Sequence, residues 1–307
     1  MYKELHDIPE LYTWKTIGKI NSGWSSDIKY YVEDYLGNKL LLRISDISYL
    51  DSKIKEFEII KKFNTLDFEM SKAISIGVCN NNKNVYMLLN WVEGVSLGKT
   101  MEKLTEKEQY DLGIQAGKVL KKIHSIDVES IDIPVKDKTE KKLQKLERYE
   151  NSSIRIDNDQ LVIDYVKSNI DKINLLPPVY KHGDFHVGNL ILTPHKHLGV
   201  IDFNRWECGD PYEEFYKVQS FDVEVSIPFS IGQIDGYFNH QPPKEFWEIL
   251  AVYVAHASLF SIAWAEKFGD NEINGMKRRA MMTFQDYDNF QIMIPHWYKD
   301  NFMKYRK

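Results

Sequence analysis

The most informative segment of this 307-residue chain reads His182-Gly183-Asp184-Phe185-His186-Val187-Gly188-Asn189, and Ile201-Asp202-Phe203 follows it shortly downstream. The glycines and polar residues around Asp184 are typical of a loop, whereas Asp202 stands at the end of a short apolar run. One loop and the end of one apolar run therefore supply three oxygen-bearing side chains, those of Asp184, Asn189 and Asp202.

Carboxylate and amide oxygens are hard ligands, and together they suit a magnesium ion. Mg²⁺ is usually held by one or two carboxylates, together with phosphate oxygens and water. If Asn189 and Asp202 hold the ion, Asp184 remains available to accept a proton from a hydroxyl group. A positioned metal, a positioned base and stabilisation of charge are the requirements of phosphoryl transfer. The segment therefore predicts a site for that chemistry.

The pattern of the surrounding chain predicts two lobes. The first ninety residues read as strands over 14–20, 28–35, 40–44, 73–78 and 85–92, with one helix over 51–63. After Glu93-Gly94 the pattern becomes mostly helical, and Thr105 to Glu108 form a capping-box signature. We expect a small sheet lobe over 1–92 and a larger, mainly helical lobe over 93–307. A cleft between two such lobes is a common ligand site.

Composition excludes several classes of protein. Hydrophobic residues make up 43% of the chain, which is enough for a substantial core, and the net charge is -5. A mildly acidic chain is a poor binder of polyanions, so we expect no nucleic-acid and no membrane partner. The most apolar stretch, Leu250 to Ala265, is too short to span a bilayer and predicts a buried helix. With only two distant cysteines and no apolar leader, a cytoplasmic protein is expected.

The motifs resemble those of the aminoglycoside phosphotransferase (APH) family. The catalytic loop of that family reads His-Gly-Asp with an Asn five residues after the Asp, as at 182–189 here. Its Ile-Asp-Phe and Gly-Asp-Pro motifs match 201–203 and 209–211. The resemblance implies an α+β, bilobal protein-kinase-like fold with a small antiparallel-sheet lobe and a larger helical lobe. It also implies transfer of the γ-phosphate of ATP or GTP, with Mg²⁺, to a hydroxyl of a small molecule.

The resemblance assigns roles to the motif residues. Asp184 would be the catalytic base, and Asn189 and Asp202 would be the Mg²⁺ ligands. His182 would hold the loop by hydrogen bonding, and Asp210 would brace it. The family usually has an Asp shortly after Gly-Asp-Pro; Glu213 and Glu214 stand there instead, and the sequence assigns neither of them a role.

The first lobe can be matched to the nucleotide site of the same family. The loop that contains Ser22, Gly23 and Ser25 lies where the nucleotide loop is expected, although it has a single glycine. Its backbone N–H groups and hydroxyls can cradle phosphate. Arg43 stands where the family has a phosphate-binding lysine. Arginine is always charged and grips phosphate in a bidentate manner, but it is not equivalent to lysine.

Two further features complete the expected nucleotide site. Glu56, on the predicted helix over 51–63, is the expected partner of Arg43, and Glu58 is the alternative. The segment between the lobes contains Asn90 and Val92, whose backbone groups are expected to hydrogen-bond a purine.

The acceptor is less closely defined. The resemblance favours an aminoglycoside, and hence a role in antibiotic resistance. A set of carboxylates after the metal motif is expected to attract such a cationic molecule: Glu207, Asp210, Glu213, Glu214, Asp222 and Glu224. Choline-like amines, homoserine or a macrolide are alternatives, the last because of the aromatic residues Trp206, Tyr212, Phe215 and Tyr216.

Two other functions differ in class. A kinase-fold protein that binds its ligand without turnover would fit Arg43 and the sparse glycine loop, but it would not need Asp184, Asn189 and Asp202 together. A protein kinase is disfavoured, because the stretch from Asp202 to Pro211 is too short for an activation segment.

Overall fold

The structure is a computed structural model that describes residues 5–21, 26–134 and 138–306. The chain divides into two compact units. We call Met1–Val95 with Asn189–Trp206 the sheet unit, and Ser96–Gly188 with Glu207–Lys307 the helical unit. Each unit is described by itself. The division predicted from sequence, 1–92 and 93–307, has no segment that returns to the sheet unit, whereas the structure assigns Asn189–Trp206 to it.

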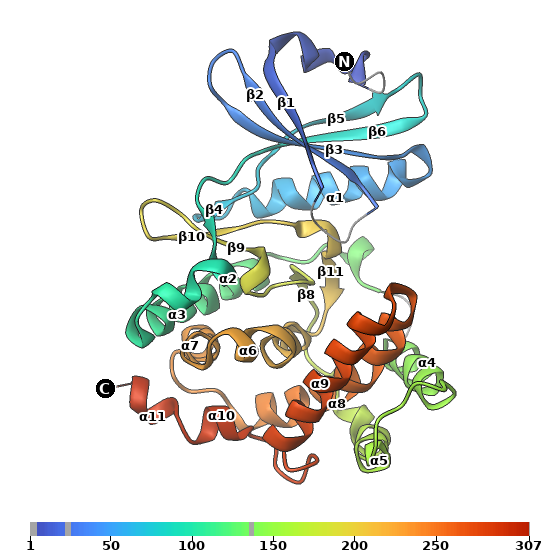
Figure 1. Ribbon diagram of the computed structural model, residues 1–307, viewed down its shortest axis with the longest axis vertical. Coiled ribbons are helices and arrows are strands. Elements are labelled where there is room, and N and C mark those ends of the chain that lie inside the picture. The colour runs from blue at the N-terminus through green and yellow to red at the C-terminus, as the bar shows by residue number, and fades with distance from the viewer. Residues whose placement is uncertain (1–4, 22–25, 135–137, 307) are drawn as a thin grey trace. The chain divides into compact units, whose positions relative to one another are not determined.

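A five-stranded antiparallel sheet forms most of the sheet unit (Figure 1). Its strands, in spatial order, are β1 (Trp14–Ile20), β2 (Ile28–Asp34), β3 (Lys39–Asp46), β6 (Asn84–Asn90) and β5 (Ala73–Cys79). Successive side chains of a strand point to opposite faces. Leu42 and Ile44 therefore enter one buried cluster with Tyr30 and Val32, and Arg43 points to the other face. The predicted strands are confirmed.

Helix α1 (Leu50–Phe63) packs against the face of the sheet to which Arg43 points, as Figure 1 shows. Its fully buried residues Ile59, Ile60 and Phe63 recur at helical spacing, while Asp51 on the first turn is exposed. Residues three apart lie on the same side of a helix, so Glu56 shares its side with Lys53. The alternation of β3 and the period of α1 thus bring Arg43 and Glu56 together.

A second, four-stranded sheet carries the Ile201-Asp202-Phe203 motif. Its order is β4 (Glu69–Met70), β10 (Leu198–Val200), β9 (Leu190–Leu192) and β7 (Val95–Ser96). Strands β9 and β10 are antiparallel, with Leu190 opposite Val200. Asn189 immediately precedes β9, and the backbone N–H of Ile201 donates to its carbonyl oxygen at 3.1 Å. The hairpin therefore brings Asn189 and the Asp202 segment to the same end.

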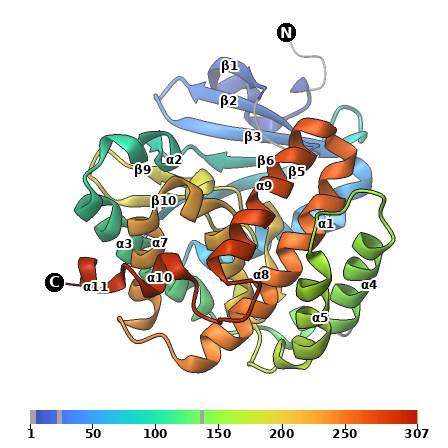
Figure 2. The ribbon, with the colours of Figure 1, turned by 60° about the horizontal axis from the view of Figure 1, so that its bottom comes forward.

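Helices dominate the helical unit. They are α2 (Leu97–Thr100), α3 (Glu106–His124), α4 (Lys138–Glu150), α5 (Asp159–Asn169), α6 (Val223–Val225), α7 (Ile227–Phe238), α8 (Lys244–Ala265), α9 (Asp270–Asp286), α10 (His296–Lys299) and α11 (Phe302–Tyr305). Helix α3 begins with the predicted capping box, in which Thr105 and Glu108 bond reciprocally. Helix α8 contacts α4, α5 and α9, and Figure 2 shows these four helices grouped together.

The apolar stretch at Leu250 to Ala265 lies in α8 and is largely buried, as predicted. Within the described residues, one helical stretch, Lys244–Phe268, has the length and composition of a membrane span. Of its most apolar window, 78% is buried inside the protein, and the core helix of a globular domain meets the same criterion.

Helices α3 and α7 touch backbone to backbone. A Cβ atom at Gly113 of α3 would lie 2.2 Å from the carbonyl oxygen of Phe229, and one at Gly236 of α7 would lie 2.3 Å from that of Ile114. Both distances are far inside van der Waals contact, so only glycine permits this approach.

A two-stranded antiparallel ladder positions the predicted catalytic loop. Strand β8 (Val179–Lys181) leads into His182-Gly183-Asp184, and β11 (Glu207–Gly209) leads into Asp210 and the following 3₁₀ turn. Glu207 pairs with Lys181 and Gly209 with Val179. Because the ladder is antiparallel, the catalytic loop begins at the end where β11 starts, and the 3₁₀ turn begins at the opposite end, where β8 starts.

Candidate active site

The Asp184 loop lies in the helical unit and holds a partly exposed carboxylate. Lys217 Nζ donates to Asp184 Oδ1 at 2.6 Å, and His186 Nε2 lies 3.7 Å from the same oxygen. Burial of Asp184 opposes ionisation, but His186 and Lys217 outweigh it and hold the pKa of the carboxyl well below its usual range. His182 is fully buried, and its Nδ1 accepts the backbone N–H of Asp184 at 3.2 Å, in keeping with its predicted structural role.

Glu214 braces the same loop through two backbone hydrogen bonds. Its two carboxylate oxygens accept the backbone N–H groups of Gly183 at 3.1 Å and of Phe185 at 3.3 Å, one on each side of Asp184. Burial of Glu214 opposes the charged form, yet the neighbouring His124, His182 and Lys181 lower its pKa to about 2. Glu214 therefore acts as a fixed anion under the loop, a role that the sequence did not assign.

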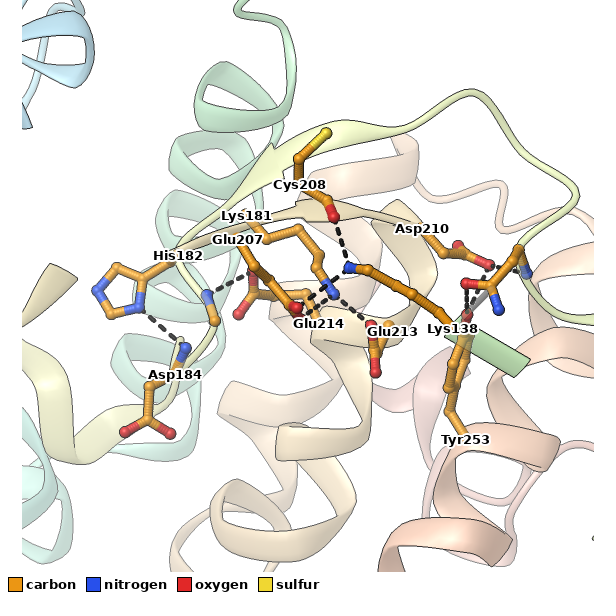
Figure 3. A network of polar contacts seen from close by, with 12 residues as sticks. Lys138, Lys181, His182, Asp184, Glu207, Cys208, Asp210, Glu213, Glu214 and Tyr253 are labelled. Carbon is orange, nitrogen blue, oxygen red and sulfur yellow. Dashed lines mark hydrogen bonds and ion pairs between the residues drawn. The ribbon is translucent and has the colours of Figure 1, made fainter. Parts of the chain in front are cut away.

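A buried ionic network continues from Glu214 along the β8–β11 ladder (Figure 3). Glu213 accepts from Lys142 at 2.5 Å and from Lys181, which also lies 2.8 Å from Glu207. Lys138 adds a contact with Glu207 at 3.1 Å. Removing one member of such a network leaves an uncompensated buried charge, which is strongly destabilising. The network therefore stabilises the pairing of β8 with β11.

Asp210 braces the chain as the motif resemblance implied. Its Oδ1 accepts the backbone N–H of Tyr212 at 2.9 Å, and its Oδ2 accepts that of Asn174 at 3.0 Å. The hydroxyl of Tyr253 donates to Oδ2 at 2.8 Å (Figure 3). Asp210 therefore links the 3₁₀ turn to a distant loop and to α8.

The carboxylates after the metal motif, which were expected to attract a cationic acceptor, are largely committed to contacts within the protein. Buried charge must be neutralised or hydrogen-bonded, and these side chains are used internally in that way. Four of them are less than 9% exposed: Asp210, Glu213, Glu214 and Asp222. The other two are more exposed but lie in ion pairs, Glu207 with Lys138 and Lys181, and Glu224 with Arg278 and Arg279.

A π-helical turn, Val218–Asp222, lies beside the Asp184 loop. Asp222 Oδ1 accepts the backbone N–H of Val187 at 2.9 Å, and burial raises the pKa of this carboxyl to about 7. The ring of Phe221 stacks on His186, with 4.9 Å between ring centroids. Such turns are frequent at functional sites.

In the sheet unit, Arg43 is almost fully buried and bound to two carboxylates. Its Nη1 donates to Glu56 Oε1 at 2.5 Å, which confirms the predicted pairing with Glu56 rather than with Glu58. Its Nε and Nη2 donate to Asp27 Oδ2 at 2.9 and 2.5 Å. Asp27 was not predicted, and it engages the Nε and Nη2 side of the guanidinium.

Lys53 completes this cluster. Its ammonium lies 2.8 Å from Asp27 Oδ2 and 3.1 Å from Glu56 Oε2. Burial of Asp27 raises its pKa, but Arg43 and Lys53 reverse the effect and lower it to about 2. Two cations and two anions thus form a neutral cluster. A cavity of about 470 Å³ lies against it, with Lys53, Asp27 and Trp206 in its lining.

The two predicted metal ligands also lie in the sheet unit, at one end of the β9–β10 hairpin. Asp202 adopts a left-handed backbone conformation with φ of 68°, which is uncommon for residues other than glycine. Its carboxylate already draws one cation, because Lys29 Nζ lies 3.7 Å from Oδ2. A carboxylate and an amide oxygen are donors that Mg²⁺ prefers, so Asn189 and Asp202 fit this ion.

The remaining predicted nucleotide-site residues give a mixed picture. Ser22, Gly23 and Ser25 lie outside the described residues. The side chain of Asn90 accepts the backbone N–H of Lys72 and donates to the carbonyl of Trp91 at 3.4 Å, while Val92 is buried. Their predicted contacts with a purine stay a prediction.

The described site residues divide between the units. The sheet unit holds Arg43, Glu56, Asn90, Val92, Asn189 and Asp202, and the helical unit holds Asp184. Sequence reasoning missed Asp27, Lys53, Glu214 and Lys217. A signal existed for Lys53, which stands three residues before Glu56 on the same helix, whereas Lys217 gave none.

This fold and these motifs define a kinase-like phosphotransferase. The sequence model of the phosphotransferase enzyme family matches residues 16–247, so the chain belongs to that family. An aminoglycoside 3'-phosphotransferase of Niallia circulans is 24% identical over 207 residues, which are 65% of this chain and 75% of that protein.

Solved structures show the same fold. The GDP complex of aminoglycoside 2'-phosphotransferase-IIIa has a TM-score of 0.68 and 15% identity, with 91% of this chain and 95% of that chain covered. The amicoumacin kinase hAmiN has a TM-score of 0.66 and 12% identity, with 92% of each chain covered. The predicted kinase-like fold, with an antiparallel sheet in its N-terminal part and a mostly helical remainder, is confirmed.

Replacing Arg43 by Met is expected to destabilise the protein by about 3–5 kcal/mol, because it leaves Asp27 and Glu56 buried with only Lys53 to neutralise them. Urea unfolding followed by circular dichroism measures this loss. Lys39→Met on the same strand is the control: Lys39 forms an exposed ion pair with Glu93, and its loss should cost less than about 1 kcal/mol. Equal unfolding midpoints for the two variants would contradict a structural role for Arg43.

Proposed function

We propose that this protein is a small-molecule kinase that transfers the γ-phosphate of ATP or GTP, with Mg²⁺, to a hydroxyl of its acceptor. The observation that carries the proposal is the Asp184 loop: a partly exposed, ionised carboxylate braced on both sides by Glu214, in a chain of the phosphotransferase enzyme family. Nucleotide use is supported by the GDP complex of one structural neighbour and the AMP-PNP complex of another.

Asp184 acts as the base in this proposal. It orients the acceptor hydroxyl and takes its proton as the new oxygen–phosphorus bond forms and the bond to the leaving oxygen of the nucleoside diphosphate breaks. Because the pKa of Asp184 is held well below its usual range, the carboxylate stays ionised at neutral pH. The proton moves late, once bonding to phosphorus has made the hydroxyl acidic.

Asn189 and Asp202 would hold the magnesium ion, which when bound neutralises negative charge on the phosphate oxygens. Asn189 and the residue before Asp202 are joined by a backbone hydrogen bond, so the chain presents the two donors together before any ion binds. Cys79 and Cys208 are free thiols, which agrees with a reducing, cytoplasmic location.

An aminoglycoside is the first acceptor to test, because the sequence relative and one structural neighbour described above are aminoglycoside phosphotransferases. Such an acceptor would make the protein an antibiotic-resistance enzyme. A second candidate is a less cationic acceptor with an apolar or aromatic part. It is favoured by the partly exposed ring of Phe221 beside His186, and by the absence of a carboxylate that is both exposed and unpaired among the six predicted to attract a polycation.

Nucleotide consumption with ATP and GTP, over a panel of aminoglycosides, amicoumacin-type compounds, macrolides, choline and homoserine, tests the proposal. One acceptor class is expected to stimulate consumption. Asp184→Ala should lower kcat by about 10²–10⁴-fold and leave nucleotide affinity within a few-fold of wild type, because it removes only the base. A near wild-type rate in the variant would remove Asp184 as the base. Tight nucleotide binding without stimulation by any acceptor would favour the non-catalytic alternative.

Replacing Asp202 by Ala is expected to abolish the dependence of nucleotide affinity on magnesium, because one of two protein ligands is lost. Isothermal titration of ATP in Mg²⁺ and in EDTA gives the ratio of the two dissociation constants, which should fall toward one in the variant. Asp210→Asn, which alters a bracing carboxylate of the helical unit, should retain the ratio. An unchanged ratio in Asp202→Ala would exclude Asp202 from the metal site.

A further inference from the structure

The sheet unit contains a lysine that can take the place of the missing strand lysine. Arg43 occupies that position in the chain, but only 3% of it is exposed, and three of its nitrogens bind Asp27 and Glu56. Arg43 is not among the residues that line the neighbouring cavity of about 470 Å³. A guanidinium this deeply buried is not presented to a ligand in that cavity.

Lys53, unlike Arg43, is accessible from the cavity. It lines the cavity, together with Ser26, Asn204 and Trp206, and 12% of its side chain is exposed. A lysine ammonium has three donors, and two of them here reach Asp27 and Glu56. The third donor remains for a ligand, and the flexible four-carbon stem can follow it.

We propose that Lys53, and not Arg43, provides the cation that contacts the nucleotide phosphates, while Arg43 is a positioning residue that holds Asp27 and Glu56. This inference rests on the proposed nucleotide use. The planar guanidinium of Arg43 can bridge two carboxylates at once. The ammonium of Lys53, on the helix that follows, is therefore the group that remains to bind a phosphate. Lys29, whose ammonium pairs with Asp202, is the rival cation of the sheet unit.

The test compares Lys53→Met, Lys29→Met and Lys55→Met, because Lys55 lines the same cavity from the same helix. Dissociation constants are measured for adenosine, AMP, ADP and ATP, or for the guanosine series if GTP is the donor. Lys53→Met should weaken ADP and ATP by about tenfold or more and adenosine by less than twofold, because only a charged contact is removed. Lys53→Arg should restore part of the affinity.

The outcomes separate the inference from the function on which it rests. If wild type binds no nucleotide, the proposed function fails. If wild type binds and Lys53→Met equals Lys55→Met, the assignment of Lys53 is overturned. If only Lys29→Met loses affinity for ADP and ATP, the phosphate contact belongs to Lys29 on β2. If Lys53→Met weakens adenosine and ATP equally, the role of Lys53 is structural only.

A second inference concerns the helical unit and stands on a different contact. Lys217 is only 5% exposed, and a buried ammonium needs a nearby negative charge. In the part of the chain that the structure describes, its one ion pair is with Asp184, at 2.6 Å. The rings of Tyr216 and Phe221 lie 5.1 and 5.2 Å from the ammonium and hold it in place.

The geometry points to Lys217 as a positioning residue that acts through Asp184. Lys217 and His186 both approach Oδ1, which fixes the rotation of the carboxylate and thereby the direction of Oδ2. Asp184 therefore keeps one orientation toward the acceptor hydroxyl, and a misplacement of about 1 Å in such a site costs of the order of 10²-fold in rate.

Lys217→Met is expected to lower kcat by about 10–100-fold and to leave the KM for nucleotide and its dissociation constant within twofold. Lys217→Arg should recover part of kcat. Lys267→Met is the matched control, since Lys267 also lies over aromatic rings of the helical unit but is exposed. Melting temperatures show whether each variant is folded.

A wild-type kcat in a folded Lys217→Met variant would overturn this inference. So would a loss of kcat that Arg fails to restore while KM rises in parallel, because that pattern indicates general damage to the site. If Asp184→Ala itself retains activity, the assignment of the base fails first, and Lys217 has nothing to position.

Discussion

The catalytic loop depends on one buried carboxylate. Glu214 accepts the amides on both sides of Asp184, so the loop can turn sharply and still leave no buried donor unpaired. Its charge is in turn stabilised by His124, by His182 and by Lys181, the last of which also binds Glu213. The position of the partly exposed Asp184 carboxylate is therefore set by a chain of mostly buried charges along the β8–β11 ladder.

The same rule explains the sheet unit. Arg43 is placed by the alternation of β3 on the face that α1 covers, where an isolated charge would be too costly. Glu56 and Asp27 neutralise it, and Lys53 balances the second carboxylate. In both units, ion pairs are largely satisfied within the protein, while Asp184 in the helical unit stays partly exposed and Lys53 in the sheet unit lines a cavity.

The sequence predicted what local patterns control. Strand alternation, helical spacing and the capping box gave the elements, and the ordered motifs gave Asp184, Asn189 and Asp202. The Arg43–Glu56 pairing also followed, because a strand and the next helix are close in the chain. Lys217 could not be found, because it reaches Asp184 from 33 residues away, and no pattern reports such a contact. Asp27 was missed because its role exists only once β2 and β3 are paired.

The burial and pairing of the acidic residues show how little net charge says about one site. A net charge of -5 does not make an acidic site when the carboxylates near the motif are buried among lysines. Attraction of a polycation requires carboxylates that face solvent without a partner, whereas those predicted here are buried or paired. In the helical unit the side chains around Asp184 are instead Lys217, His186 and Phe221. These side chains present an ammonium, an imidazole and an aromatic ring beside Asp184 rather than unpaired carboxylates.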